Sequence, residues 1–471
     1  MPITVLGGTT SAAGAFEVAN SVRMNGDARM YITPSAGDAD KWTFSCWVKR
    51  SIISSGSQTL ISAKDGSNYM TEIRFNSDDT IDFYSEDGAS GFNGRLNTSR
   101  KFRDVSAWYH VVAVWDSENG TAGNRMRLYI NGVEETAFGT DTNPSDGDDS
   151  YIGANIVHTV GDKGDDSQNF KGYMAEVYYC NGQAYAASDF GEFDEDSPTI
   201  WKPKDASGLT FGTGGFYLDF EASDNLGNDA NGGTDLTENG LAATDQSVDS
   251  PTNNFCVVNP LDNYHAGATL TEGNCLVAHP SAKYNYITST FGVSKGKWYF
   301  EGKLTVSGGT AATIGIAAEP TTSASDHLGG DAQGISIYQT DDGTFIRTSG
   351  SNTTLGDSDV VANDIIGVFI DLDNNKIYGS VNGTLETTTG ISITAAASQT
   401  HGLYFPAMGD YDGGQAYTWA MNFGGCPSFA LSSAVSDDNG YGNFEYTPTV
   451  TVDSASTKFY ALCTKNLAEY G

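Results

Sequence analysis

Short segments in which apolar and polar residues alternate recur along the chain from Trp42 almost to its end. In residues 42–48 every second position is apolar, beginning with Trp42 and Phe44, so one face of this segment is expected to lie in a core. Further strand-like segments, divided by turn residues, follow at 59–63, 72–75, 80–84, 171–180, 297–306, 314–317, 334–338 and 344–347. We therefore expect a chain of short β-strands.

Two pairs of segments have the pattern of β-hairpins. WYHVVAVWD at 108–116 precedes RMRLYING at 125–132, and DIIGVFIDLD at 364–373 meets KIYGSVNG at 376–383 across an Asn-Asn turn. In both pairs the first strand ends in Asp and the second closes on Asn-Gly. Two domains of similar architecture explain this repeat, as do the ordinary hairpins of any β-meander; we adopt the first interpretation.

The segment between the two strand-rich regions is polar, acidic and rich in Gly and Asn. Its aromatic residues, among them Trp201, Phe216, Tyr217 and Phe220, favour docking on the first domain over disorder. The predicted division is an N-terminal arm (1–19), a first sandwich (20–188), this connector (189–254), a second sandwich (255–448) and a C-terminal strand or tail (449–471).

The composition agrees with an all-β protein of two antiparallel sandwiches. Apolar residues make up 39% of the 471 positions, and Gly is frequent at 56 residues against 12 Pro. Such a chain has enough apolar material for two cores and enough turn residues to connect many short strands.

The charge excludes two classes of partner. With 59 acidic and 25 basic residues the formal net charge is −34, which repels nucleic acid phosphates and anionic membrane surfaces. No run of about 18 apolar residues occurs, so no membrane insertion is expected.

The cysteines and the first residues bear on the place of synthesis. The six cysteines lie far apart without a CxxC pair, which favours free buried thiols and a reducing environment. Residues 1–15 lack the basic region and apolar core of a secretory signal. We expect synthesis in a reducing cytoplasm without a signal peptide, and exit by lysis if the protein acts outside the cell.

Residues 20–180 resemble a concanavalin A-like, laminin-G-type jelly roll of the kind common in phage structural proteins. The resemblance is carried by NSVRMNGDARMYITPSAGDADKWTFSCWVKRS, WYHVVAVWD, RLYINGV and KGYMAEVYYCNGQ. The following stretch, with DFGEFDED, WKPK, GGFYLDFE and NLGNDANGG, resembles the segment that follows this jelly roll in marine phage virion proteins.

Residues 297–425 are similar to the SPRY family, which is also a concanavalin A-like sandwich. The motifs are GKWYFEGKL, NDIIGVFIDLDNNKIYGSVNG, GLYFPAMGDY and WAMNFG, and the closing KFYALCTKNL resembles the tail of such phage proteins. These resemblances imply an external virion protein whose sandwiches bind glycans or protein partners.

Concanavalin A-like folds also include glycoside hydrolases, so paired carboxylates were sought. Glu192, Asp194 and Asp196 alternate as those enzymes require, but Gly191 before them and Ser-Pro after them predict a loop rather than a rigid strand. The histidines are dispersed, no Gly-x-Ser-x-Gly elbow is present, and His110 is expected to be a half-buried structural residue. We predict no catalytic residue and no enzymatic activity.

Calcium is the one cofactor that the sequence suggests, because hard cations need several oxygen ligands close together. The metal candidates are Asp162, Asp165 and Asp166; the acidic stretch 146–149 and the pair Asp371 and Asp373 were weighed beside them. Solvated acidic loops without an ion explain the same clusters.

Sugar sites pair an aromatic face with polar hydrogen-bonding groups. Loop segments 67–69, 338–342 and 410–412 have this mix, which makes Tyr69, Tyr338, Asp410 and Tyr411 the ligand-binding candidates. Tyrosine packing at strand ends is the alternative explanation.

These observations predict an external structural protein at the surface of a bacteriophage virion, either an adhesin or a head or tail fibre or decoration protein. The expected partners are other virion proteins, further copies of the chain in a homo-oligomer, and a host-surface glycan. Two alternatives stay open: a glycoside hydrolase of concanavalin A-like fold, and a purely structural capsid or tail protein without a host ligand.

Overall fold

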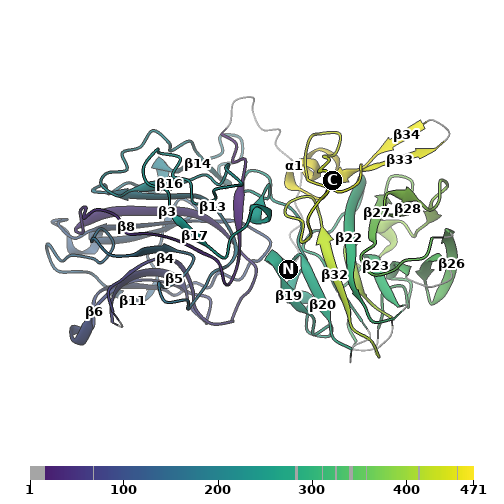
Figure 1. The fold of residues 1–471 in the computed structure, drawn as a ribbon, viewed down its shortest axis with the longest axis horizontal. Coiled ribbons are helices and arrows are strands. Elements are labelled where there is room, and N and C mark those ends of the chain that lie inside the picture. Colours follow the sequence, from purple (N-terminus) through teal and green to yellow (C-terminus); the bar gives the residue numbers. More distant parts are fainter. Residues whose placement is uncertain are drawn as a thin grey trace. The chain divides into compact units, whose positions relative to one another are not determined.

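Alternating apolar residues pair into antiparallel sheets in both halves of the chain, which confirms the all-β prediction. The computed structural model describes residues 16–66, 68–281, 285–309, 311–323, 326–338, 343–356, 358–411, 414–452 and 455–471. Described residues up to Thr252 form an N-terminal unit, and those from Asn253 onward form a C-terminal unit (Figure 1).

The N-terminal unit contains two large sheets. Sheet 1 has the order β10 (Val133–Glu134), β9 (Met126–Ile130), β8 (Tyr109–Asp116), β3 (Lys41–Arg50), β13 (Lys171–Asn181), β1 (Ser21–Asn25) and β18 (Gln246–Ser247), with β16 (Phe216–Leu218) also beside β13. Sheet 2 has the order β11 (Phe138–Thr142), β7 (Phe92–Thr98), β6 (Ile81–Asp87), β5 (Tyr69–Phe75), β4 (Gln58–Lys64), β12 (His158–Val160), β2 (Arg29–Ile32) and β17 (Thr237–Asn239). A separate hairpin joins β14 (Gly191–Phe193) and β15 (Trp201–Pro203).

Sheets 1 and 2 pack face to face, because large apolar side chains of both enter one core. Trp42 of β3 and Trp115 of β8 stack with 6.5 Å between ring centroids. Both rings meet Phe83 of β6 across the core, at 5.6 and 6.3 Å. Each such side chain contributes about 1.5–3 kcal/mol or more when fully buried.

The other face of sheet 1 is covered as well. Apolar side chains of residues 184–217 form a second cluster with those of β8 and β13. Tyr217 of β16 stacks on Tyr178 of β13 with 4.3 Å between ring centroids. Almost every residue of β3 and β13 is therefore buried, and the acidic connector is a third layer of the N-terminal unit.

A β-bulge in β13 places a carboxyl group beneath this third layer. The strand register shifts between Ala175 and Tyr178, and Glu176 adopts φ +51°. The hydroxyl groups of Tyr178 and Tyr217 donate hydrogen bonds to its carboxylate. Burial raises the pKa of Glu176 to about 7, although the two hydroxyl groups act in the opposite direction.

The end of the connector is held to sheet 1 by a buried ion pair. β18 pairs with β1, and just beyond it Asp249 accepts hydrogen bonds from Lys49 Nζ at 2.7 Å and from Trp108 Nε1 at 3.1 Å. Both charged side chains are 1% exposed. Loss of either partner would leave a buried charge uncompensated.

The C-terminal unit also contains two large sheets. Sheet 3 has the order β19 (Thr269–Thr271), β20 (Leu276–His279), β32 (Tyr417–Asn422), β22 (Lys297–Ser307), β27 (Ile365–Asp371), β28 (Lys376–Val381) and β29 (Thr384–Leu385); β30 (Ile391–Ser392) pairs with β28, and β35 (Tyr460–Ala461) pairs in parallel with β22. Sheet 4 has the order β21 (Tyr286–Thr288), β31 (Phe405–Asp410), β23 (Ala312–Ala317), β24 (Gly334–Tyr338), β25 (Thr344–Thr348) and β26 (Ser351–Gly356). Residues of both sheets, such as Trp298 and Ile314, share one core.

Sheets 1 and 3 have the same strand order. In sheet 1, β3 lies between β8 and β13; in sheet 3, β22 lies between β27 and β32. The hairpins β8–β9 and β27–β28 both form, and each second strand turns through Asn-Gly into a short edge strand. Asn131 and Asn382 adopt φ +49° and +48° there, which suits such tight turns. The repeat in the sequence thus reflects a shared architecture.

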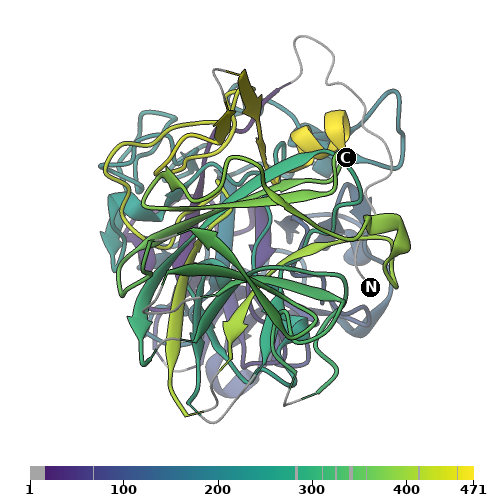
Figure 2. The same cartoon turned by 90° about the vertical axis from the view of Figure 1, so that its right-hand side faces the viewer.

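The last residues of the chain belong to the C-terminal unit. The hairpin β33 (Thr449–Val452) with β34 (Ala455–Lys458) precedes β35 and the helix α1 (Thr464–Tyr470), which Figure 2 shows beside the strands of this unit. Buried Glu301 of β22 accepts the backbone N–H groups of Glu445 and Tyr446 at 3.0 and 2.8 Å. Asp437 accepts from Ala461 N and Asn466 Nδ2 at 2.9 and 2.7 Å. Two buried carboxylates therefore fix this segment.

Two further expectations concern the cysteines and membranes. Cys46, Cys180, Cys256, Cys275, Cys426 and Cys463 are free and buried. Within the described ranges, no helix is both long and apolar enough to span a bilayer.

Substitution Asp249→Asn should destabilise the N-terminal unit by about 3–5 kcal/mol, because it leaves Lys49 buried without its counter-charge. Guanidinium denaturation of the full chain, with the transitions of the two units fitted separately, measures this change. Asp224→Asn, which alters an exposed acid of the same connector, is the matched control. Equal stability of the two variants would contradict the role assigned to Asp249.

The raised pKa of Glu176 predicts a pH dependence. The folded state binds the proton more tightly than the unfolded state, so the stability contributed by protonated Glu176 is fully present below pH 4.5 and is lost as pH rises through about 7. The difference in unfolding free energy between wild type and Glu176→Gln should fall across this window. Exposed Glu195→Gln should show no such trend, and a flat difference for Glu176→Gln would refute the assignment.

Candidate functional site

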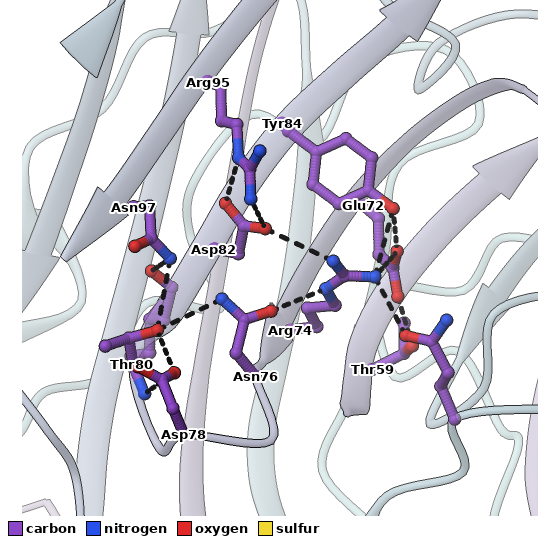
Figure 3. Close-up of polar contacts among 12 residues, drawn as sticks. Thr59, Glu72, Arg74, Asn76, Asp78, Thr80, Asp82, Tyr84, Arg95 and Asn97 are labelled. Carbon is purple, nitrogen blue, oxygen red and sulfur yellow. Dashed lines mark hydrogen bonds and ion pairs between the residues drawn. The ribbon is translucent and has the colours of Figure 1, made fainter. Parts of the chain in front are cut away.

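Strands β5, β6 and β7 direct alternate side chains to the outer face of sheet 2. Ile73, Phe83 and Leu96 point into the core, so their neighbours along each strand point outward. The outward residues form a continuous polar network of Glu72, Arg74, Asp82, Tyr84, Arg95 and Asn97 (Figure 3).

Asp82 is the centre of this network. It is fully buried and receives two hydrogen bonds of 2.9 Å from Arg95, through Nε and Nη2. Arg74 Nη2 donates to the same carboxylate at 3.3 Å. Such a bidentate pair is stronger than a neutral hydrogen bond and fixes the plane of the Arg95 guanidinium.

Glu72 forms the second half of the network. Its carboxylate accepts from Thr59 Oγ1 at 2.5 Å, from Arg74 Nη1 at 3.2 Å and from the Tyr84 hydroxyl. Burial, and next the nearby Glu72 charge, raise the pKa of Tyr84, so its hydroxyl keeps its proton. Arg74 also lies over the Tyr84 ring at 4.9 Å.

Strand β7 carries the groups of the network that are accessible to a ligand. Phe92 is 44% exposed, and the Arg95 guanidinium lies 4.6 Å from its ring centroid. Neither Arg95 Nη1 nor Asn97 Oδ1 has a hydrogen-bond partner among the described residues, whereas Asn97 Nδ2 donates to Thr80 Oγ1 at 3.1 Å. One strand thus presents an apolar ring, a donor and an acceptor.

Sequence analysis missed this face, because the search for ligand residues was confined to loops. The signal was present in the charged residues that alternate with apolar ones, as in Thr-Glu-Ile-Arg-Phe at 71–75 and Ile-Asp-Phe-Tyr at 81–84. Strand register, which brings Asp82 opposite both Arg74 and Asn97, was needed to recognise it.

The predicted ligand residues are divided between the two units of the chain. Tyr69 begins β5, is 45% exposed and meets Tyr151 edge-on at 6.2 Å, while Tyr338, Asp410 and Tyr411 belong to the C-terminal unit. Ser67, residues 339–342 and Asp412 lie outside the described residues. The ligand-binding role of the segments 67–69, 338–342 and 410–412 stays a prediction from the sequence.

Tyr338 and Tyr411 are in contact, with 5.3 Å between ring centroids. Arg347 lies 4.2 Å from the Tyr411 ring and donates to the Tyr411 hydroxyl at 3.1 Å and to His327 Nε2 at 3.2 Å. Burial, with a smaller effect of Arg347, lowers the pKa of His327 to about 4. Asp410, in contrast, is fully buried at the end of β31, whereas the side chains of this cluster are half-buried.

The predicted metal candidates each lie beside a cationic side chain. Arg29 contacts Asp166 and lies 3.6 Å from Asp162, and Lys64 contacts Asp165. In the part of the chain that the structure describes, no three His, Cys, Asp or Glu side chains are arranged to hold a metal ion. Calcium binding stays a prediction from the sequence.

The other two acidic clusters also contain ion pairs. Lys297 Nζ lies 2.6 Å from Asp373 and 3.5 Å from Asp371, and Arg125 lies 3.4 Å from Asp146 in the 146–149 stretch.

The expectation of a loop at Glu192 was wrong for residues 191–193, which form β14. Its partner strand β15 follows only after a turn, and Trp201 packs against Phe193 at 4.9 Å between ring centroids. Lys202 Nζ lies 3.5 Å from Glu192 and 3.3 Å from Asp194. Asp194 also accepts the backbone N–H of Asp196, so these acids are engaged with their own hairpin.

His110 is buried rather than half buried, because the connector covers it with Trp201. Trp201 Nε1 donates to His110 Nδ1 at 3.0 Å, which leaves Nε2 as the N–H that donates to Ser45 Oγ at 2.8 Å. With this tautomer His110 does not accept the Ser45 proton. Burial lowers the pKa of His110 to about 3.

Residues 25–187 match the model of the concanavalin A-like lectin/glucanases superfamily, and residues 297–425 match the SPRY domain model. The chain carries a concanavalin A-like domain followed by a SPRY domain. No curated protein matches the chain. The polar face of sheet 2 belongs to the concanavalin A-like domain, and the Tyr338–Tyr411 pair belongs to the SPRY domain.

Solved structures similar to each domain are distant in sequence. A heptameric SAP-like pentraxin from Limulus polyphemus is 17% identical, covering 36% of this chain and 80% of that chain with a TM-score of 0.28. The SPRY domain of human HERC1 is 17% identical, covering 34% and 96% with a TM-score of 0.27. Domain 4 of AbnA, a GH43 extracellular arabinanase from Geobacillus stearothermophilus in complex with arabinotriose, is 18% identical, covering 38% and 79% with a TM-score of 0.28.

Proposed function

We propose that the concanavalin A-like domain binds a neutral glycan on the outer face of sheet 2, without catalysis. The observation that carries this proposal is the arrangement on β7, where the exposed Phe92 ring, Arg95 Nη1 and Asn97 Oδ1 follow one another along a strand. A pyranose ring offers an apolar face for the aromatic side chain and hydroxyl groups for the donor and the acceptor.

Charge balance favours a neutral ligand. The two guanidinium groups of the face, Arg74 and Arg95, are matched by the two buried carboxylates Glu72 and Asp82. The whole chain is strongly acidic at −34, so no excess of positive charge attracts an anionic polysaccharide.

The burial of the carboxylates supports binding over hydrolysis. A glycoside hydrolase needs two carboxyl groups in contact with the scissile bond, one of them as an acid or a nucleophile. Glu72 and Asp82 are fully buried and occupied by arginine, threonine and tyrosine donors. They orient the arginines instead of facing the ligand.

We further propose that the protein acts at the surface of a bacteriophage virion, as an adhesin or as a fibre or decoration protein, in a homo-oligomer with other virion proteins. The resemblance of residues 20–180 and of the segment after them to phage structural proteins supports this placement. The SPRY domain, with its half-buried Tyr338, Tyr411 and Arg347 cluster, offers a second surface suited to a protein partner.

Glycan array binding followed by titration tests the proposed glycan face, which is the outer face of sheet 2 with Phe92, Arg95 and Asn97. Phe92→Ala and Arg95→Lys should each raise the Kd for the neutral glycans that the wild-type protein binds by about tenfold. Phe92→Ala removes the contact with the aromatic ring, and Arg95→Lys removes the guanidinium group that Asp82 orients. The controls are Phe193→Ala, an exposed aromatic residue outside the face, and Arg100→Lys, an exposed arginine. Wild-type binding that neither face variant reduces would refute the proposed face.

Electron microscopy of intact virions with gold-labelled antibody against this chain tests the placement. Label at regular positions on the head or the tail is the expected result, and chemical cross-linking there should show more than one copy per position. Particles that contain no such chain would rule out the virion proposal, while leaving glycan binding to be judged on its own titration.

A further inference from the structure

A polar pocket of about 380 Å³ lies beside the glycan face, in the same unit of the chain. Loops around Gly26, residues 52–58 and residues 166–171 form its walls. Its volume falls within the range of about 300–1,000 Å³ typical of small-molecule sites. Gln168 of the pocket wall accepts a hydrogen bond from Arg74, which belongs to the polar network.

The loops of this pocket hold backbone conformations that non-glycine residues rarely adopt. Ser54, Asp166 and Gln168 have φ of +51°, +56° and +58°. Each such residue costs roughly 1–2 kcal/mol, so the surrounding contacts must enforce it. Asp79 accepts from Ser54 N and Oγ at 2.7 and 2.8 Å, and Gln168 O accepts from Thr59 N at 2.7 Å. Strain of this kind concentrates at functional sites.

The pocket wall offers several polar groups to a ligand. The hydroxyl groups of Ser55 and Ser57 and the ammonium of Lys171 have no partner among the described residues. Asn169 Nδ2 donates to Gly26 O at 2.9 Å, but its Oδ1 is buried without a hydrogen bond. A ligand with several hydroxyl groups could form hydrogen bonds with these donors and acceptors at the same time.

The charge of the wall is balanced. Lys171 supplies one positive charge, and Asp166, which pairs with Arg29, supplies one negative charge. The wall thus offers an uncharged sugar both a cationic donor and an anionic acceptor for its hydroxyl groups.

Strand register connects the pocket to the glycan face. Asn97 pairs with Asp82, Asp82 with Arg74, and Arg74 with Thr59, whose N–H reaches Gln168. Gln168 Oε1 in turn accepts from Arg74 Nη1 at 3.0 Å. This row crosses three strand spacings of about 4.8 Å, roughly 14 Å from β7 to β4. That distance suits an oligosaccharide that runs across the strands.

We propose that this pocket binds the terminal sugar residue of the neutral glycan, and so selects which glycan end the domain recognises. The inference rests on the proposed glycan function of the sheet 2 face and adds to it a site for a single, uncharged sugar. The pocket would then recognise the end of the glycan, and Phe92 and Arg95 would contribute affinity along the rest of the glycan.

Saturation-transfer NMR with neutral methyl glycosides of glucose, galactose, mannose, fucose and N-acetylglucosamine tests the pocket. At least one should bind wild type, and Ser55→Trp, which fills the pocket from an exposed position, should abolish its signal. Ser223→Trp, at an exposed serine of the connector in the same N-terminal unit, is the matched control and should bind as wild type does. Lys171→Met, a smaller change, should weaken binding and keep the melting temperature unchanged.

Oligosaccharides that end in the recognised sugar complete the experiment. Ser55→Trp should raise their Kd by about tenfold, and NaCl raised from about 50 to about 500 mM should leave the wild-type Kd unchanged. If Phe92→Ala weakens oligosaccharide binding but Ser55→Trp and Ser223→Trp bind with the same Kd, the inference about the pocket is wrong and the proposed glycan face is supported.

The converse failure is distinguishable. Monosaccharide binding that Ser55→Trp abolishes, together with oligosaccharide binding that Phe92→Ala leaves intact, would support the pocket and overturn the face. Preference for glucuronate or galacturonate over the neutral sugars, lost at high salt, would overturn the neutral ligand class.

Discussion

Burial of both faces of one sheet is the constraint on which each unit depends. Sheet 1 is packed against sheet 2 on one side and against residues 184–217 on the other. A polar chain segment that covers a sheet must have its buried backbone and side-chain groups satisfied. Buried carboxylates provide this: Asp249 and Glu176 hold the connector, and Glu301 and Asp437 hold the last forty residues or so of the chain.

This arrangement determines where a ligand has access to the concanavalin A-like domain. Sheet 1 is covered on both faces, whereas the outer face of sheet 2 ends in a layer of polar side chains that satisfy one another. Arg74, Asp82 and Arg95 form a layer that is stable without a covering segment, while Phe92 projects above it. In the proposed function, the same chemistry that would otherwise fix a covering segment serves to bind a glycan.

The sequence allowed the architecture to be predicted but not the site. Local alternation identified the hairpins β8–β9 and β27–β28, and the Asn-Gly turns mark corresponding places in both units. Contacts between residues far apart in the sequence could not be predicted. Lys49 and Asp249 are separated by 200 positions, and Arg74 and Gln168 by 94 positions. Such pairs depend on strand order and register, which apolar periodicity does not specify. Residues in loops, such as Tyr69 and Tyr411, were therefore favoured over the strand residues that form the face.

A rigid ionic layer is well suited to weak, repeated binding of sugars. A free arginine side chain loses conformational freedom when it binds, at a cost of about 0.5–1.5 kcal/mol for each immobilised side chain. Asp82 has already fixed Arg95, and Glu72 has fixed Arg74, so a ligand meets donors that are in place beforehand. In the proposed glycan site the buried carboxylates would thus contribute to binding strength without touching the ligand, and the same burial that orders the arginines would keep these acids away from a glycosidic bond.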